Sequence, residues 1–280
     1  MKLITYRSGG RVSYGAVVDG GVVDLAKRLP QQSLKALLAA GAVGEAKRAI
    51  AGQAPDVKLA DIVYLPPVPD PDKIICIGLN YDDHRKETGR EKTAYPTLFT
   101  RFADTQVGHG QAMVKPKSSD KLDYEGELAV IIGKRGRHVP KERALDHVAG
   151  YSCYHDGSVR DWQFHTSQFV PGKNFPATGG FGPWMVTADE IPDPTKLTLV
   201  TRLNGQEVQR AGTDLMIFPI PELIAYITTF TELAPGDVIP TGTPAGVGSK
   251  RTPPLFMKPG DIAEVDISNV GVLKNAIIGE

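Results

Sequence analysis

The chain has 280 residues, enough for one large domain or two unequal domains with a sizeable core. Its hydrophobic content of 41% and charged content of 23% are typical of a soluble globular protein. The 32 Lys and Arg residues balance the 32 Asp and Glu residues, so no net field favours nucleic acid or an anionic membrane as a partner.

The sequence shows neither a signal peptide nor an apolar run long enough to span a membrane. Its two cysteines, Cys76 and Cys153, are far apart in apolar surroundings, which is typical of small core residues. We therefore expect a cytoplasmic protein. The 30 glycines and 22 prolines indicate many turns and hence a β-rich fold.

Residues 1–25 are predicted to form a β-meander, because short alternating runs are separated by turns at Gly9-Gly10 and at 19–21. Leu34 to Ala51 has helical spacing and good helix formers. A proline-rich stretch follows at 65–71 and indicates a domain boundary. We expect a small N-terminal β-rich domain over 1–66 and a larger domain over 67–280.

A strand over 73–78 leads to Asn80, the predicted N-cap of a helix that ends at Gly89. His84 and Glu87 are three positions apart on this helix and share one face. A carboxylate beside an imidazole raises its basicity and fixes its tautomer, as the activation of water requires. A surface salt bridge is the alternative for such a pair taken alone.

The apolar run 128–132 predicts a buried strand, and Glu125 and Glu127 lie at its leading end. Because alternate side chains of a strand share a face, the two carboxylates point the same way, where they repel and lose hydration. A hard divalent cation relieves both costs. The alternative is a solvated strand end with two surface glutamates.

A second strand, from Val148, ends at Asp156, the usual place for a third metal carboxylate. Lys173 lies in a predicted turn beside Gly172, which permits close approach to a ligand. The last third is predicted to be mostly β, with a helix over 220–230 and a closing strand over 262–267. The glycine-rich run 241–248 lacks the ending of a phosphate loop, but it could place hydroxyl and N–H groups around a carboxylate.

Taken in order, these segments resemble the fumarylacetoacetate hydrolase family, and the similarity extends from about residue 73 to the end of the chain. The matching motifs are Gly78-Leu79-Asn80-Tyr81 with His84, Asp123-Tyr124-Glu125-Gly126-Glu127-Leu128, Asp156 with Ser158, Arg160-Asp161 and Gln163, Gly172-Lys173, Gly182-Pro183-Trp184, Thr241-Gly242-Thr243-Pro244 and Pro259-Gly260-Asp261.

The resemblance implies a β-rich α+β fold, a mixed β-sandwich roll, in a homodimer that binds Mg²⁺ or Mn²⁺, with Ca²⁺ as a third candidate. By position, it implies metal ligation by Glu125, Glu127 and Asp156. It also implies water activation by His84 and Glu87 on a lid helix, and a catalytic contact from Lys173. Substrate contacts are implied for the remaining matched positions, which are Tyr81, Arg160, Gln163 and Thr243.

Three positions depart from the family pattern. His155 precedes the third carboxylate where asparagine is expected, which could alter the surroundings of the metal. The segment 174–180 replaces a Phe-Asp-Thr run, and His165 stands where arginine is frequent. The last two departures bear on the identity of the substrate rather than on metal binding.

A charge count supports this site. Three carboxylates and one divalent ion leave a net charge of minus one, and a keto acid adds at least one more negative charge. Lys173 and Arg160 bring the total charge back near zero, as a buried site needs. We predict a metal-dependent C–C hydrolase that cleaves a 2,4-dioxo acid, an acylpyruvate such as fumarylpyruvate or maleylpyruvate, to pyruvate and a carboxylic acid in aromatic catabolism.

Two alternatives keep the same metal and keto acid. One is an oxaloacetate decarboxylase or an isomerase of the 2-hydroxymuconate type, and the other is hydrolysis of a diketo sugar acid. The His84–Glu87 pair favours hydrolysis modestly. A non-catalytic, metal-stabilised binding protein is the alternative from a different class.

Overall fold

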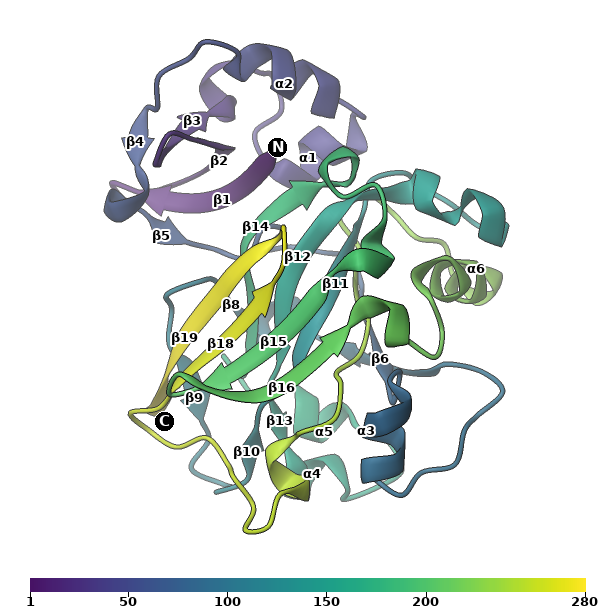
Figure 1. Cartoon of the computed structure of the whole chain (residues 1–280). Helices are drawn as coiled ribbons and strands as arrows, with labels where there is room; N and C mark the ends of the chain where they lie inside the picture. Colours follow the sequence, from purple (N-terminus) through teal and green to yellow (C-terminus); the bar gives the residue numbers. More distant parts are fainter.

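A twelve-stranded sheet runs through the molecule, and the computed structural model describes all 280 residues (Figure 1). Its main path has the order β4-β3-β2-β1-β14-β12-β11-β17-β6-β7, with β5 paired to β1 and β8 paired to β14. The strands are β1 (Lys2–Ser8), β2 (Arg11–Val18), β3 (Gly21–Asp24), β4 (Val57–Lys58), β5 (Val63–Tyr64), β6 (Ile74–Gly78), β7 (Thr97–Arg101), β8 (Gln106–Val107), β11 (Gly126–Ile132), β12 (Val148–Asp156), β14 (Gly179–Thr187) and β17 (Val238–Pro240).

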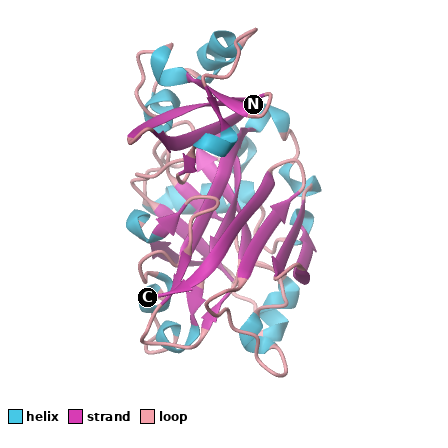
Figure 2. Ribbon diagram, turned by 90° about the vertical axis from the view of Figure 1, so that its left-hand side faces the viewer, coloured by secondary structure: helices cyan, strands magenta, loops and turns pink.

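A second sheet of five strands, in the order β16-β15-β18-β19-β9, packs against β11, β12 and β14 of the first (Figures 1 and 2). Its strands are β9 (Met113–Lys115), β15 (Thr198–Leu203), β16 (Gln206–Gly212), β18 (Ile262–Ile267) and β19 (Gly271–Gly279). A separate pair joins β10 (Leu122–Asp123) to β13 (Ser158–Val159). The two packed sheets confirm the predicted β-rich α+β class.

The helices are short and lie around the sheets. They are α1 (Leu34–Ala39), α2 (Val43–Ile50), α3 (Asp82–Glu87), α4 (Arg160–Gln163), α5 (Val170–Lys173) and α6 (Ile220–Phe230). Single 3-10 turns or short 3-10 segments occur at Leu25–Lys27, Leu59–Asp61, Ala103–Thr105, Lys141–His147, Ala188–Glu190, Pro194–Lys196, Thr213–Leu215 and Gly248–Lys250. None of the helices combines the length and apolarity that crossing a bilayer requires.

Strand β11 is the centre of the architecture, because every one of its residues is buried. Leu128, Val130 and Ile132 face a core of 27 residues that includes α6 and strands of the second sheet. The residues between them, Ala129 and Ile131, face a second core of 19 residues on the other side of the sheet. The apolar run that predicted this strand therefore reflects burial on both faces.

The N-terminal strands continue the main sheet instead of forming a separate layer. Strand β1 pairs with β14 in antiparallel register, with Leu3 opposite Met185, and both residues belong to the second core. The predicted boundary between residues 66 and 67 stays a prediction, although backbone pairing and a common core join the segments on its two sides.

The structure confirms the meander of β1 to β3, strand β11, strand β12 ending at Asp156, helix α6, strand β18 and the two buried, unpaired cysteines. Three predictions were wrong in detail. The helix expected over 34–51 is divided at Gly41, which has a φ of +64°. Tyr81 rather than Asn80 is the N-cap of α3. Lys173 ends the short helix α5 and does not lie in a turn.

Candidate active site

Three buried carboxylates converge at one end of the paired strands β11 and β12. Glu125 directly precedes β11, Glu127 is its second residue, and Asp156 is the last residue of β12. The N–H of Asp156 donates to the Glu125 carbonyl oxygen at 2.8 Å, which fixes the strand ends together. One oxygen from each carboxylate lies within 4.8 Å of the other two. The predicted shared face of Glu125 and Glu127 is thus confirmed.

This donor set fits a hard divalent cation. Carboxylate oxygens are the ligands that Mg²⁺, Mn²⁺ and Ca²⁺ prefer, and three buried carboxylates so close together repel one another. The effect of this repulsion is largest at Glu127. Burial, and then the charges of Asp156 and Glu125, raise its pKa well above the ordinary value.

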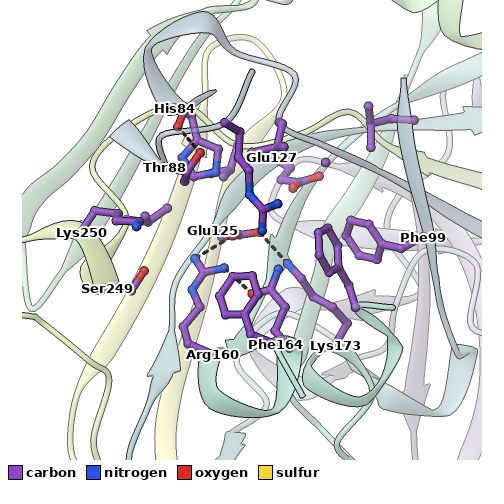
Figure 3. Close-up of a pocket in the computed structure, with 18 residues that line it drawn as sticks. His84, Thr88, Phe99, Glu125, Glu127, Arg160, Phe164, Lys173, Ser249 and Lys250 are labelled. Atoms are coloured by element: carbon purple, nitrogen blue, oxygen red, sulfur yellow. Dashed lines mark hydrogen bonds and ion pairs between the residues drawn. The ribbon is translucent and has the colours of Figure 1, made fainter. Parts of the chain in front are cut away.

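Cationic side chains hold the other two carboxylates. Lys173 places its Nζ atom 2.8 Å from Glu125 Oε2 and 2.6 Å from Asp156 Oδ2, and Figure 3 shows it beside Glu125. Burial alone would raise the pKa of Glu125, but Lys173 and Arg160 outweigh it and lower that pKa to about 2. Burial would likewise lower the pKa of Lys173, yet Asp156 and Glu125 raise it. Glu125 and Lys173 therefore form a charged pair.

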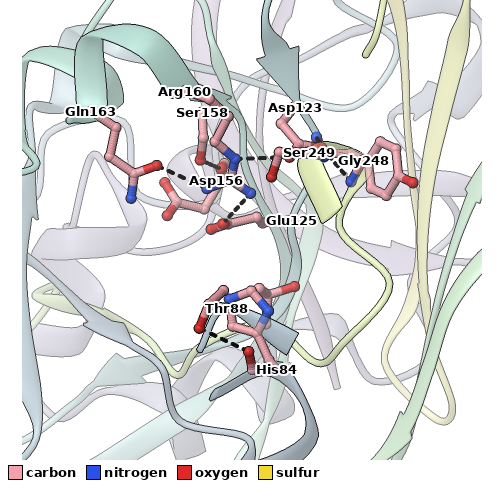
Figure 4. A network of polar contacts seen from close by, with 12 residues as sticks. His84, Thr88, Asp123, Glu125, Asp156, Ser158, Arg160, Gln163, Gly248 and Ser249 are labelled. Carbon is pink, nitrogen blue, oxygen red and sulfur yellow. Dashed lines mark hydrogen bonds and ion pairs between the residues drawn. The ribbon is translucent and has the colours of Figure 1, made fainter. Parts of the chain in front are cut away.

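Arg160 links Glu125 to Asp123 and Gln163. Its Nη2 atom lies 2.7 Å from Glu125 Oε1, and its Nε atom donates to Asp123 Oδ2 at 2.8 Å. Its Nη1 atom donates to Gln163 Oε1 at 2.9 Å, one turn along α4 (Figure 4). Asp123 also accepts the N–H groups of Gly248 and Ser249, at 2.7 and 2.9 Å. Asp123 therefore fixes both Arg160 and the turn after β17.

The imidazole of His84 lies on the other side of Glu125 from Arg160 and Gln163 (Figure 4). Its Nδ1 atom is 3.2 Å from Glu87 Oε2, within hydrogen-bond reach. Glu87 is held in turn by the N–H of Gly246, at 3.0 and 3.2 Å from its two oxygens. Since the carboxylate accepts the Nδ1 proton, Nε2 is the basic atom on the pocket side.

A pocket of about 270 Å³ joins these groups. It combines charged and polar side chains with the apolar side chains of Ile77, Leu79, Phe99, Phe164, Phe169 and Val247. Of the predicted site residues, those that line it are His84, Glu125, Glu127, Arg160, Gln163, Lys173 and Thr243. Glu87 and Asp156 lie directly behind that wall, bonded to His84 and Lys173.

Tyr81 is the predicted site residue that the structure does not bring to the pocket. It is buried in the larger core, and its hydroxyl has no hydrogen-bond partner. Thr243 does reach the pocket, where its hydroxyl donates to the Gly126 carbonyl and accepts from Gln209. The catalytic and binding roles assigned from the sequence stay predictions for all of these residues.

His155, the residue that departs from the family pattern, faces away from the carboxylates. Its Nδ1 atom lies 3.0 Å from the Met113 sulfur, and its Nε2 atom has no partner. Burial lowers its pKa to about 4, so this imidazole is neutral at pH 7. Alternation along β12 explains the result, because neighbouring residues of a strand point to opposite faces.

Sequence reasoning missed Arg101, at the end of β7. Its Nη1 atom lies 2.6 Å from Asp156 Oδ1 and also donates to the Gly157 carbonyl, while Nη2 donates to Thr178 Oγ1 at 2.9 Å. It thus adds a third cation to the two that the charge count had assigned. No sequence signal pointed to it, because a single arginine that ends a strand has no local partner.

The packed sheets, the acidic cluster and the adjacent histidine–glutamate pair define an enzyme-like centre suited to a divalent metal. Comparison with known proteins agrees: residues 73–278 match the family model described as fumarylacetoacetate (FAA) hydrolase C-terminal. The chain therefore belongs to the fumarylacetoacetate hydrolase family, a family of enzymes, as the sequence motifs predicted.

Individual relatives differ in their reactions. The human protein "Oxaloacetate tautomerase FAHD2A, mitochondrial" is 38% identical over an alignment that covers 99% of this chain and 92% of the relative. Fumarylacetoacetate hydrolase from Exiguobacterium antarcticum has a TM-score of 0.86 at 34% identity, covering both chains fully. Maleylpyruvate hydrolase from Sphingobium sp. SYK-6, solved with manganese(II) and pyruvate, has a TM-score of 0.83 at 29% identity, covering 100% of this chain and 99% of that one.

Proposed function

We propose that this protein catalyses proton transfer at the carbon next to the keto group of a 2-oxo acid, with the keto–enol tautomerisation of oxaloacetate as its reaction. The observation that carries the proposal is the His84–Glu87 pair, whose basic Nε2 atom faces a pocket with cations and clustered carboxylates beyond it. The 38% identity to a human oxaloacetate tautomerase over almost the whole chain favours this substrate.

We further propose that Glu125, Glu127 and Asp156 hold Mg²⁺ or Mn²⁺. The fit of the donor set and the manganese in a maleylpyruvate hydrolase of the same fold support this assignment. A divalent cation at this position would supply a Lewis acid that stabilises negative charge on the keto oxygen.

The protein's own groups account for the proton movements. His84 Nε2 takes a proton from C3 as the C–H bond breaks, while Glu87 stabilises the imidazolium that forms. Lys173, held as an ammonium by its two carboxylate partners, stabilises the oxygen on which charge develops. The imidazolium then returns a proton to that oxygen, so the keto form becomes the enol and His84 is restored.

Hydrolysis of an acylpyruvate in aromatic catabolism is the second candidate, supported by the maleylpyruvate hydrolase of the same fold. In that reaction His84 would deprotonate water rather than carbon. The homodimer and the cytoplasmic location expected from the sequence stay proposals as well.

The deciding experiment follows three reactions in parallel: loss of the enol absorbance of oxaloacetate, pyruvate release from oxaloacetate, and pyruvate release from acylpyruvates. Each is measured with Mg²⁺ or Mn²⁺ and with a chelator. Tautomerisation is expected to depend on the metal and to lose about 10²- to 10⁴-fold in kcat in His84→Asn. His138→Asn is the matched control, because His138 is exposed and has a φ of +53°, which asparagine tolerates.

Each contrary result has a definite meaning. Pyruvate release from an acylpyruvate alone would replace the proposal with hydrolysis, and release from oxaloacetate without enol turnover would replace it with decarboxylation. No turnover of any keto acid would point to a non-catalytic, metal-stabilised binding protein. Equal tautomerisation by wild type and His84→Asn would refute the role of the pair.

A further inference from the structure

The cationic side chains that line the pocket fall into two groups. Lys173 and Arg160 are buried and are engaged by carboxylates of the protein. Arg90 and Lys250 also line the pocket, but they are exposed, and neither has an acidic partner within ion-pair distance. Two positive charges therefore face the pocket without a counter-charge from the protein.

Both residues stand on fixed backbone. The N–H of Arg90 donates to the Arg85 carbonyl at 3.1 Å, and the Arg85 guanidinium donates back to the Arg90 carbonyl at 2.8 Å. Lys250 ends the 3-10 turn Gly248–Lys250, whose first two N–H groups are bound by Asp123. Figure 3 shows Lys250 next to Ser249, on the side of the pocket away from Phe99. The fold thus fixes the backbone from which each of the two cationic side chains extends.

We propose that Arg90 and Lys250 form a second anion subsite that binds the distal carboxylate of a short 2-oxo dicarboxylate. The inference rests on the proposed function, which places the keto oxygen of the substrate at Lys173. A monocarboxylate would leave the outer cations unpaired, whereas a dicarboxylate pairs both ends. A pocket of about 270 Å³ is at the small end of ligand sites, which favours a short chain.

The test compares two stable 2-oxo acids of equal chain length, 2-oxoglutarate and 2-oxopentanoate, which differ only in the distal carboxylate. Their dissociation constants are measured by calorimetry on the full-length protein with Mg²⁺. Wild type is expected to bind 2-oxoglutarate about tenfold more tightly, and the preference is expected to shrink with added salt because both cations are exposed.

The Arg90→Gln/Lys250→Gln double variant is expected to bind the two acids equally, with its affinity for 2-oxopentanoate unchanged. Lys92→Gln is the matched control, since it removes one exposed positive charge from the same loop but not from the pocket wall, and its preference is expected to stay that of wild type.

A wild type that binds both acids alike, or fails to bind 2-oxoglutarate, would overturn the subsite. A double variant that still binds 2-oxoglutarate more tightly than 2-oxopentanoate would also overturn the subsite. The binding measurement does not require turnover, so its result is separate from that of the tautomerisation assay. Enol turnover without a dicarboxylate preference would refute the subsite and leave the proposed function standing. A preference for the dicarboxylate without enol turnover would support the subsite and refute the proposed function.

Discussion

Arg101 is an enclosed cation on which one carboxylate of the acidic cluster depends. Its side chain and that of Asp156 are both 0% exposed. Arg101→Met keeps much of the volume but leaves the Asp156 charge without this partner. Breaking a buried ion pair is costly, so we expect this variant to lose about 3 kcal/mol of the free energy of unfolding, measured by urea denaturation with a chelator present.

The control for that experiment is Arg202→Met. Arg202 pairs with Asp266 at 3.0 Å, but the two side chains are 28% and 34% exposed. Because water screens such a pair, this variant is expected to lose no more than about 1 kcal/mol. Equal losses in the two variants would show that burial does not set the contribution of Arg101.

Glu127 is expected to make the proposed metal binding depend on pH. Burial, Asp156 and Glu125 raise its pKa well above the ordinary value, whereas the pKa of Glu125 is about 2. A cation binds the ionised carboxylate, so binding below the raised pKa is expected to release a proton from Glu127 and none from Glu125. Metal affinity should therefore increase as pH rises through the raised pKa of Glu127.

Calorimetric titration of the protein with Mg²⁺ in two buffers of different ionisation enthalpy measures this proton directly. The observed binding heats should differ by the number of protons released, multiplied by the difference between the ionisation enthalpies of the two buffers. Identical heats in the two buffers would mean that Glu127 is already ionised in the metal-free protein.

At the scale of elements, the segment that leads into helix α3 is held by the side chain of Asn80. Its Nδ2 atom donates to the carbonyls of Phe218 and Thr241, at 3.1 and 2.8 Å, and its Oδ1 atom accepts the Phe218 N–H at 2.8 Å. Asn80→Ala leaves these buried groups unpaired. We expect it to cost about 2–3 kcal/mol of the free energy of unfolding, again measured with urea.

The same substitution should reach the active site, because α3 carries His84 and Glu87. We expect kcat of Asn80→Ala to fall even at temperatures where the variant is fully folded, as its circular dichroism would show. A stable variant with wild-type kcat would mean that the anchoring of this segment does not position the pair.

The sequence predicts an element well when nearby residues indicate it, and poorly when the element depends on residues far along the chain. The glycine turns and the apolar run of β11 are enough to predict β1 to β3 and β11 from the local sequence. The prediction that Asn80 is an N-cap was wrong because a side chain that can cap a helix here binds residues 138 and 161 positions away instead. The helix break has a local signal in Gly41 itself, which adopts a φ of +64°.

The candidate site divides in the same way. Strand alternation and a strand end were enough to bring Glu125, Glu127 and Asp156 together. Arg101 lies 55 positions from Asp156 in the sequence, and three strands separate β7 from β12 in the sheet, so no local pattern indicates their contact. The two outer cations also depend on tertiary structure, since nothing near Arg90 in the sequence indicates that Lys250 shares its pocket.

At the scale of the whole molecule, the N-terminal 66 residues and the rest of the chain share more than a linker. Strand β1 extends the main sheet at β14, and the Lys2 ammonium lies 4.6 Å from the centre of the Trp184 ring. Tyr14 and Leu37 belong to the same core as Ala129 and Phe181. A sheet and a core that cross the predicted boundary couple the stabilities of its two sides.

We therefore expect the protein to unfold as one cooperative unit. Native-state hydrogen exchange read by mass spectrometry should give amides of β1 and β2 the same opening free energy as those of β11 and β12, because opening β1 exposes apolar residues of the common core. Two independent domains would predict the opposite, with the N-terminal strands exchanging through a lower-energy opening that leaves β11 protected. Leu3→Ala separates the two cases: in a coupled molecule it lowers the protection of β11 as much as that of β1, whereas across an independent boundary only β1 to β3 would lose protection.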